Sequence, residues 1–236
     1  MAIKAVLFDL DGTLLPMDQD IFIKAYFGGI AAKLAPCGYE PKALIGAIWQ
    51  GTEDMIRNDG SRTNEEAFWK RFCEIYGERA RDDEPTFEDF YKNEFQGVKA
   101  VCGFAKESKE IVDSLRARGI RCVLATNPIF PRIATESRIR WAGLTPEDFE
   151  LVTTYENVGY CKPNPKYYSE ILSRLGLGAE ECVMVGNDVG DDMIAEKLGM
   201  KVFLLTNDLI NKTDTDISAY PHGGFGELID FLGEIV

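Results

Sequence analysis

The chain contains 236 residues, of which 45% are hydrophobic and 28% are charged, the proportions of an ordinary globular protein. Its 39 acidic residues outnumber 26 Lys and Arg and give a net charge of −13. We therefore expect no nucleic-acid partner, because so acidic a protein repels phosphate backbones. A small anionic ligand requires a local source of positive charge.

The six cysteines include no C-x-x-C pair. This pattern predicts reduced, mostly packed thiols in a cytoplasmic protein, and neither a zinc site nor a disulfide framework. The segment Met1-Ala2-Ile3-Lys4 runs directly into a strand pattern, so we expect no signal peptide. No apolar run approaches the ~18 residues of a membrane helix, and we expect no membrane partner.

Short apolar runs recur along the chain, and each is followed by a turn and a helical pattern. The runs cover residues 5–8, 122–125, 151–154, 182–185 and 202–205. They are apolar or β-branched on both faces, which is typical of central strands in a parallel sheet. Helical patterns that begin at proline or end at glycine cover residues 105–118, 131–142, 164–176 and 191–198. The alternation predicts a doubly wound, Rossmann-like α/β sheet.

One connection is too long for this scheme. About 95 residues separate the first strand from the helix near residue 105, whereas a crossover needs only a dozen or so. The excess carries helical patterns at 21–34, 42–56 and 65–77, the last behind the capping box Thr63-x-x-Glu66, and a fourth after residue 86. We therefore predict an α-helical cap domain at 17–97, inserted into an α/β core formed by 1–16 and 98–236.

Acidic side chains follow two of the predicted strands. Asp9 and Asp11 come directly after the first strand, and Asp188, Asp191 and Asp192 follow the fourth. An Asx turn or helix capping explains one or two of these residues, but not two acidic clusters at carboxyl ends of strands, where ligands bind in open α/β sheets. Because neighbouring carboxylates repel each other, the clusters favour a shared cation, and their hard oxygen ligands suit Mg²⁺.

Possible anion donors follow the other two strands. Thr126-Asn127 comes after the second strand, where a hydroxyl and a backbone amide can donate hydrogen bonds, although turn chemistry alone also explains the pair. Lys162 lies beside Pro163 after the third strand. A lone lysine is usually solvated, but four polar signals at the ends of successive parallel strands are far more specific than any one of them.

Together these residues resemble the haloacid dehalogenase-like hydrolases, most of which are phosphatases. The segment Phe8-Asp9-Leu10-Asp11-Gly12-Thr13-Leu14 is similar to the first motif of the family. Thr126 corresponds to the second motif, Lys162 to the third, and Gly186-Asn187-Asp188 with Asp192 to the fourth. The resemblance covers the predicted core from end to end, and the helical insert corresponds to a cap of that family.

The resemblance implies a reaction through an aspartyl-phosphate. Asp9 is then the nucleophile, and Asp11 is the general acid that protonates the leaving oxygen and later the base that activates water. Thr126 and Lys162 hold the phosphoryl oxygens, assisted by the amide of Asn127. The implied enzyme is a phosphatase of a small phosphate monoester, such as a sugar phosphate or a nucleotide, and the cap is expected to select that substrate.

The resemblance also implies a magnesium site. Asp9, the backbone carbonyl of Asp11 and Asp188 bind the ion, and Asp192 orders the surrounding residues. The family often has aspartate directly after the glycine of its fourth motif, where this chain has Asn187. We therefore assign the ligand to Asp188, the next residue.

Four alternatives remain open. A phosphomutase uses the same core, whereas a dehalogenase uses the first aspartate without the second, so Asp11 favours phosphate ester hydrolysis. A receiver domain carries its phosphoacceptor after a later strand and has no inserted cap, so Asp9 at the first strand counts against it. A non-catalytic binding module is the fourth alternative, and the intact set of motif residues counts against it.

Overall fold

The computed structural model describes residues 2–236 and contains one parallel sheet. Its strands are β1 (Ala5–Phe8), β2 (Arg121–Leu124), β3 (Leu151–Val152), β4 (Cys182–Gly186), β5 (Lys201–Leu205) and β6 (His222–Gly223). They lie side by side in the order β3-β2-β1-β4-β5-β6, and every pairing is parallel. Five strands were predicted. β6 has only two residues and no apolar run, so periodicity could not reveal it.

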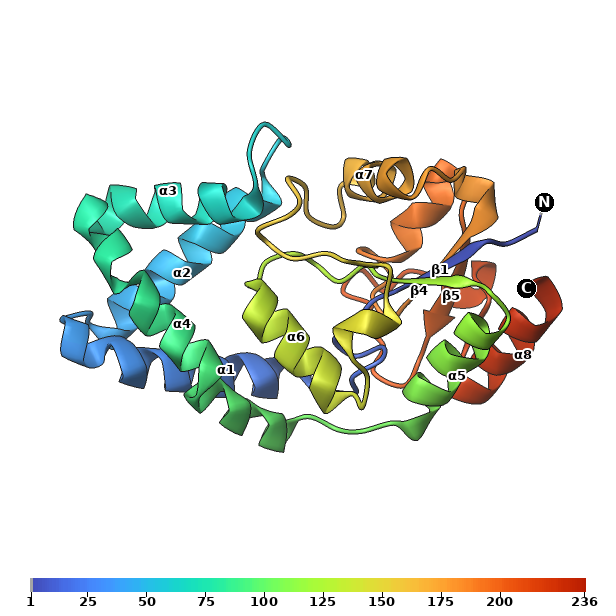
Figure 1. Ribbon diagram of the computed structural model, residues 1–236, viewed down its shortest axis with the longest axis horizontal. Helices are drawn as coiled ribbons and strands as arrows, with labels where there is room; N and C mark the ends of the chain where they lie inside the picture. Colours follow the sequence, from blue (N-terminus) through green and yellow to red (C-terminus); the bar gives the residue numbers. More distant parts are fainter. Residues whose placement is uncertain (1) are drawn as a thin grey trace.

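Helices cover both faces of the sheet, as Figure 1 shows. They are α5 (Lys106–Ala117), α7 (Pro165–Leu175) and α8 (Phe225–Ile235), whereas α6 (Arg132–Trp141) lies between the sheet and residues 84–101. Val6 and Phe8 of β1 pack in one apolar cluster with residues of α5 and α8, whereas Ala5 and Leu7 pack in the other with residues of α7. Successive strand residues therefore serve opposite layers, which confirms the predicted doubly wound fold.

One predicted helix takes a different form. The segment predicted as helix 191–198 contains a 3₁₀ helix at Met193–Leu198. Before it, Asp188 Oδ1 accepts hydrogen bonds from the amides of Gly190 at 2.7 Å and Asp191 at 3.0 Å. These bonds fold residues 188–192 into a tight turn directly after β4, so the regular helical pattern begins later than the sequence suggested.

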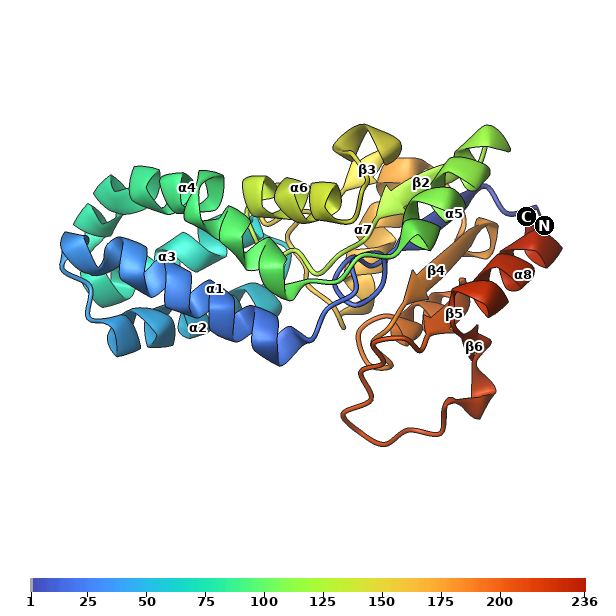
Figure 2. The ribbon, with the colours of Figure 1, turned by 90° about the horizontal axis from the view of Figure 1, so that it is seen from below.

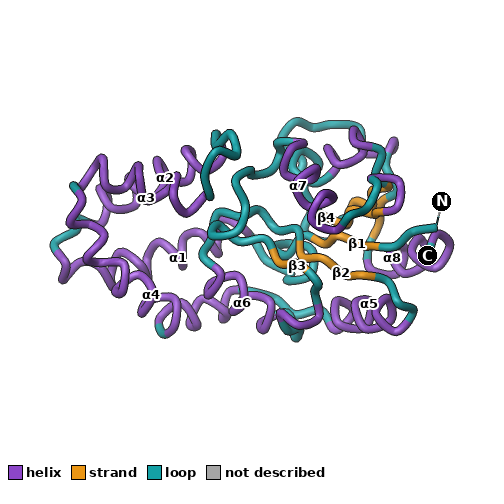
Figure 3. The backbone as a smooth tube through the Cα atoms, turned by 45° about the horizontal axis from the view of Figure 1, so that its top comes forward, coloured by secondary structure: helices purple, strands orange, loops and turns teal. Residues whose placement is uncertain are grey.

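Four of the five α-helices between β1 and β2 in the chain form a bundle beyond the carboxyl ends of the strands, as Figures 1 and 3 show. They are α1 (Gln19–Leu34), α2 (Pro41–Ile56), α3 (Asn64–Tyr76) and α4 (Glu84–Lys92), followed by the 3₁₀ helix η3 (Glu94–Val101). The capping box of Thr63 and Glu66 is present at the start of α3. We call residues 19–101 the helical insert.

The chain enters and leaves the insert at neighbouring points, as Figure 2 shows. Met17 forms an antiparallel bridge with Cys102, and the amide of Gly103 donates to the carbonyl of Pro16 at 2.7 Å. The sequence placed the second boundary at residue 97, but η3 continues through that position to Val101. That the insert behaves as a separate cap domain stays a prediction.

The far end of the insert also contacts the core. Asn64, at the start of α3, is fully buried. Its Nδ2 donates to the carbonyl of Pro128 at 3.2 Å, and its backbone amide donates to the carbonyl of Val158 at 3.0 Å. The next amide, that of Glu65, donates to the carbonyl of Tyr155 at 2.8 Å. These bonds seat the insert over the loops that follow β2 and β3.

None of the helices within residues 2–236 is long and apolar enough to cross a membrane.

Candidate active site

A buried lysine and a buried aspartate form the centre of the site. Asp9 follows β1 directly, and its amide donates to the carbonyl of Val185 in β4 at 2.9 Å, which extends the sheet by one residue. Lys162 lies in the loop between β3 and α7 and is 2% exposed. Its Nζ donates to Asp9 Oδ1 at 2.8 Å. The other oxygen of Asp9 has only a long 3.5 Å contact with the hydroxyl of Thr13, so it remains available to a ligand.

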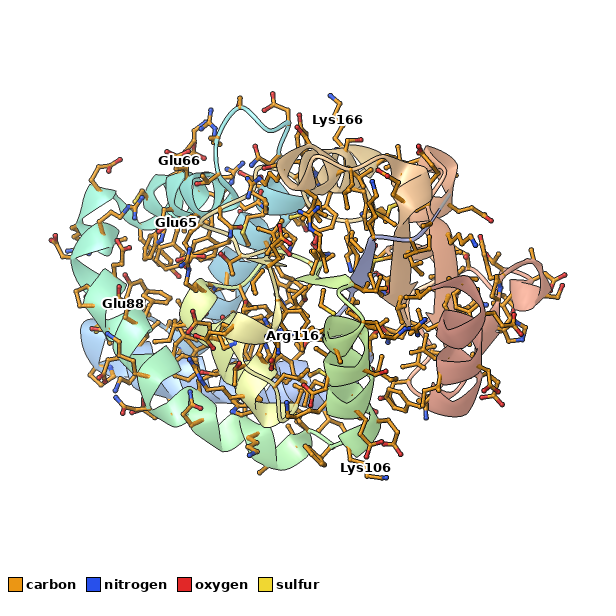
Figure 4. The ribbon with its side chains drawn as sticks, turned by 45° about the vertical axis from the view of Figure 1, so that its right-hand side comes forward. Glu65, Glu66, Glu88, Lys106, Arg116 and Lys166 are labelled. Carbon is orange, nitrogen blue, oxygen red and sulfur yellow. The ribbon has the colours of Figure 1, made fainter. Side chains whose placement is uncertain are left out.

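Lys162 also binds a second carboxylate. Its Nζ donates to Asp192 Oδ1 at 2.6 Å. Burial alone lowers the pKa of Lys162, but the charges of Asp192 and Asp9 outweigh it and raise that pKa well above the usual value. Lys162 therefore stays protonated and supplies the positive charge that an acidic protein needs at an anion site. By contrast with Lys162, the side chains of Lys106 and Lys166 lie at the surface and point away from the core, as Figure 4 shows.

Asp11 is paired with an arginine that sequence reasoning missed. Arg138 of α6 is fully buried and donates through Nη1 to Asp11 Oδ2. Its guanidinium also lies 4.4 Å from the ring centroid of Phe130, a cation–π contact. Burial raises the pKa of Asp11, and the nearby charge of Arg138 opposes that rise. Asp11 Oδ1 is buried without a hydrogen-bond partner among the described residues.

The turn after Asp11 depends on Gly12. This residue has a φ of +84°, and a Cβ there would meet Nδ2 of Asn187 at 2.2 Å, so glycine is required on both counts. Asn187 accepts from the hydroxyl of Thr13 at 3.1 Å and donates to the carbonyl of Asp208 at 2.6 Å. Asn187 thus joins the loops after β1, β4 and β5 at the position where the resembling family often carries aspartate.

The three aspartates that follow Asn187 differ in their hydrogen-bond partners. Asp192 is 1% exposed and uses one oxygen for Lys162 and the other to accept from the Asp188 amide at 3.0 Å. Asp191 Oδ2 accepts from Asn127 Nδ2 at 3.3 Å. Asp188 holds the turn through Oδ1 alone. Both oxygens of Asp192 are thus engaged within the protein, and Asp188 is the more accessible of these two carboxylates.

Among residues 2–236 there is no group of three or more His, Cys, Asp or Glu side chains arranged to hold a metal ion. A cation at this site would therefore be held by fewer carboxylates, with backbone oxygens, waters and ligand oxygens completing its shell. This is the usual manner in which proteins bind Mg²⁺, through one or two carboxylates together with substrate phosphates.

A cavity of about 410 Å³ brings all the predicted site residues together. These are Asp9, Asp11, Thr126, Asn127, Lys162, Asp188 and Asp192, and Asn187 and Asp191 also line the cavity. Thr126 is 2% exposed, held where its carbonyl accepts from Thr153 and Tyr167, both at 2.8 Å. Asn127 Oδ1 is buried and without a partner in the described chain. The polar residues that follow β1, β2, β3 and β4 thus line the same cavity.

The cavity also has walls that no motif predicted. α1, α2, α3 and α4 contribute aromatic side chains, and we call six of them the aromatic wall. They are Phe22, Phe27, Trp49, Phe68, Trp69 and Phe87. Helical periodicity could assign them to an apolar face, but it could not tell which apolar side chains would face a cavity and which would only pack.

The chain is similar in sequence to known hydrolases, and the two relatives named below act on phosphorus compounds. The model of the haloacid dehalogenase-like hydrolases matches residues 3–199. A pyrophosphatase of Halalkalibacterium halodurans is 26% identical over 239 residues, covering 99% of this chain and 98% of that protein. A glyceraldehyde 3-phosphate phosphatase of Methanothermobacter thermautotrophicus is 28% identical over 225 residues, covering 88% and 87%.

Among solved structures, the chain is similar to a 2-haloacid dehalogenase from Pseudomonas syringae pv. Tomato DC3000. The TM-score is 0.68 at 21% identity, and the match covers 99% of this chain and 100% of that one. At this level of identity the likeness concerns the fold alone.

Proposed function

The chain belongs to the haloacid dehalogenase-like hydrolases, and we propose that it is a Mg²⁺-dependent phosphatase that hydrolyses a small phosphate monoester through an aspartyl-phosphate on Asp9. The observation that carries this proposal is the buried pair of Asp9 and Lys162 at 2.8 Å, with Asp11 two residues further on and in the same cavity. The pair provides a nucleophile and a fixed positive charge for a phosphoryl group.

In the first step the free carboxylate oxygen of Asp9 attacks phosphorus. A bond forms between that oxygen and phosphorus, and the bond from phosphorus to the ester oxygen breaks. Lys162 and Thr126 hold the equatorial oxygens of the transferring group, where negative charge must be stabilised. Protonated Asp11 transfers its proton to the leaving oxygen, so that an alcohol departs and not an alkoxide.

In the second step water attacks phosphorus of the aspartyl-phosphate. Asp11, now ionised, accepts the proton of that water, and the bond between Asp9 and phosphorus breaks to release inorganic phosphate. Arg138 acts as a positioning residue, because its buried ion pair with Asp11 Oδ2 fixes the carboxyl group while Oδ1 remains unpartnered.

The residues present fit a magnesium ion. Asp9 and Asp188 line the same cavity. Asp188 has one oxygen outside the hydrogen bonds that hold its side chain. Asp9 Oδ1 accepts a hydrogen bond from Lys162 and keeps a second lone pair for a cation, so the other oxygen of Asp9 stays free to attack phosphorus. These two carboxylates and the carbonyl of Asp11 would hold the ion. Bound Mg²⁺ neutralises charge on the phosphoryl oxygens and orients them for in-line attack. Asp192 would act indirectly, by holding Lys162 and the amide of Asp188.

Phosphate ester hydrolysis is favoured over dehalogenation. A departing halide needs no proton, so Asp11 would have no role as a general acid in a dehalogenase. The names of two relatives, a pyrophosphatase and a glyceraldehyde 3-phosphate phosphatase, both describe reactions at phosphorus and support a phosphatase over a dehalogenase. A phosphomutase uses the same residues, and we place it second.

We extend the proposal to a cytoplasmic location. All six cysteines are free, and Cys122, Cys161 and Cys182 are buried. Unpaired thiols of this kind are typical of reducing compartments.

The proposal is tested with acetyl phosphate, a small and reactive phosphoryl donor. Purified protein should release inorganic phosphate with Mg²⁺, lose this activity with EDTA and recover it when Mg²⁺ is restored. Ca²⁺ should support it poorly, because its larger and looser coordination shell disturbs in-line geometry. Full activity after exhaustive chelation would overturn the metal assignment, and no activity under any condition would overturn the proposed function.

A further inference from the structure

The aromatic wall surrounds the part of the cavity that lies beyond the phosphoryl-binding residues. Its rings pack against one another, since the centroids of Trp69 and Phe87 lie 5.4 Å apart at an interplanar angle of 78°, and those of Phe27 and Trp49 also lie 5.4 Å apart. Trp49 is 45% exposed although it lines the cavity, so it lies at the rim. A substrate anchored by its phosphate would place its leaving group among these rings.

The hydroxyl groups of the insert that border the cavity are engaged within the insert, whereas the indole Nε1 of Trp69 is buried without a partner among the described residues. The hydroxyls of Tyr26 and Tyr91 are hydrogen-bonded at 3.0 Å. The hydroxyl of Thr52 donates to the carbonyl of Ile48 within its own helix at 2.9 Å. Gln19 is the one amide side chain that the described part of the insert contributes to the lining. The walls therefore offer few hydrogen bonds to a sugar or another polyol.

Positive charge is confined to the core side of the cavity. Within residues 2–236 the insert contributes no Lys, Arg or His to the lining, and the lining cations are Lys162 and Lys212 of the core. Lys162 already binds Asp9 and Asp192. Lys212 belongs to the loop after β5. A second phosphate or a carboxylate placed among the rings of the insert would find no cation of the insert beside it, which is costly.

We infer, resting on the proposed function, that the substrate is a phosphate monoester whose leaving alcohol carries an uncharged aromatic ring close to the ester oxygen. The aromatic wall buries that ring by the edge and face contacts that aromatic groups prefer. A cavity of about 410 Å³ suits a metabolite-sized molecule, since pockets for small ligands range from roughly 300 to 1,000 Å³. The core thus recognises the phosphate and the insert selects the ring.

The inference is tested with three esters of primary alcohols, which are 2-phenylethyl phosphate, 2-cyclohexylethyl phosphate and phosphoglycolate. We expect kcat/KM to be highest for 2-phenylethyl phosphate and to exceed that for phosphoglycolate at least roughly tenfold, the lower end of what an apolar pocket distinguishes. Equal or reversed values for these two overturn the inference. Equal values for the phenyl and cyclohexyl esters overturn its aromatic part.

Variants of Trp49, at the rim of the cavity, test whether the aromatic wall causes the preference for an aromatic leaving group. Trp49→Ala should lower the ratio of kcat/KM for 2-phenylethyl phosphate to that for acetyl phosphate by roughly tenfold, whereas Trp49→Phe should largely preserve it. Ile75→Ala is the matched control, because Ile75 lies on α3, is 39% exposed and is absent from the lining. An unchanged ratio in Trp49→Ala overturns the inference. Acetyl phosphate separates the outcomes, because its hydrolysis reports the proposed function whatever the ring preference.

Discussion

The core side and the insert side of the cavity are built in opposite ways. On the core side, charged groups are held by short bonds to strand-end loops, as in the 2.8 Å contact between Lys162 and Asp9. On the insert side, aromatic rings from four helices face the same space, and the hydroxyls of Tyr26 and Tyr91 bind each other. The difference separates two tasks. Charge stabilisation requires fixed positions, whereas recognition of an apolar leaving group requires only shape and area.

The largest effect is expected from a substitution at the centre of the core side of the cavity. Asp9→Asn removes the nucleophile and should lower phosphatase kcat by roughly 10³-fold or more, as loss of a nucleophile does in other covalent enzymes. Phosphate release from acetyl phosphate measures this, with circular dichroism to check the fold. Asp18→Asn is a suitable control, because Asp18 is an exposed cap of α1. Turnover of Asp9→Asn near that of the unmodified protein would contradict the mechanism.

The sequence predicted the core side well for a physical reason. Parallel strands end at one edge of a sheet, so Asp9, Thr126, Lys162 and Asp188 had to lie close together once the strands were recognised. Arg138 was not predicted as a site residue, because it reaches the site from a helix and not from the end of a strand. Its only signal was a charged residue on the apolar stripe of Ala134 and Trp141.

The sequence did not predict the aromatic wall or the hydrogen bonds of Asn64, for a different reason. They depend on how the insert sits on the core, and nothing in the periodicity of a helix specifies that placement. The second boundary of the insert, expected at residue 97, also depended on tertiary contacts, since the chain returns to the core beside Pro16 only at Gly103.

A smaller effect is expected at the phosphoryl contacts. Thr126→Val keeps the size of the side chain but removes its hydroxyl. By analogy with the loss of one oxyanion donor, kcat should fall by roughly 10²–10³-fold. Thr213→Val serves as a control, because Thr213 is exposed in the loop after β5. If Thr126→Val loses no more activity than this control, the hydroxyl does not contact the transferring group.

The ion pair behind Asp11 should contribute to stability as well as to positioning. Arg138→Leu leaves the carboxyl of Asp11 without its buried partner and should lower the free energy of unfolding by about 1.5–3 kcal/mol, the range for hydrogen bonds to charged groups. Arg140→Leu is the matched control on the same helix, because Arg140 forms an exposed pair with Glu136 and such pairs contribute less than about 1 kcal/mol. Urea denaturation of both variants measures the difference, and equal losses would contradict the assignment.

The smallest expected effect concerns the seating of the insert. Asn64→Ala removes the hydrogen bond to Pro128 and should raise KM for 2-phenylethyl phosphate more than for acetyl phosphate, which needs little contact with the walls. Hydrogen exchange at the amide of Glu65, which donates to Tyr155, should become faster. Ser61→Ala, at an exposed position of the same loop, is the control. An equal rise in both KM values would show that Asn64 does not act through the walls.

The most direct test of the account is to trap the phosphoryl group on Asp9. In Asp11→Asn, acetyl phosphate can still phosphorylate Asp9, because acetate leaves without a proton, but no base remains to activate water. Acid quenching, digestion and mass spectrometry should therefore find the phosphoryl group on the peptide containing Asp9, approaching one per chain in the variant and less in the unmodified protein. Phosphate release by the variant with no adduct at Asp9 at any time point would contradict the aspartyl-phosphate mechanism.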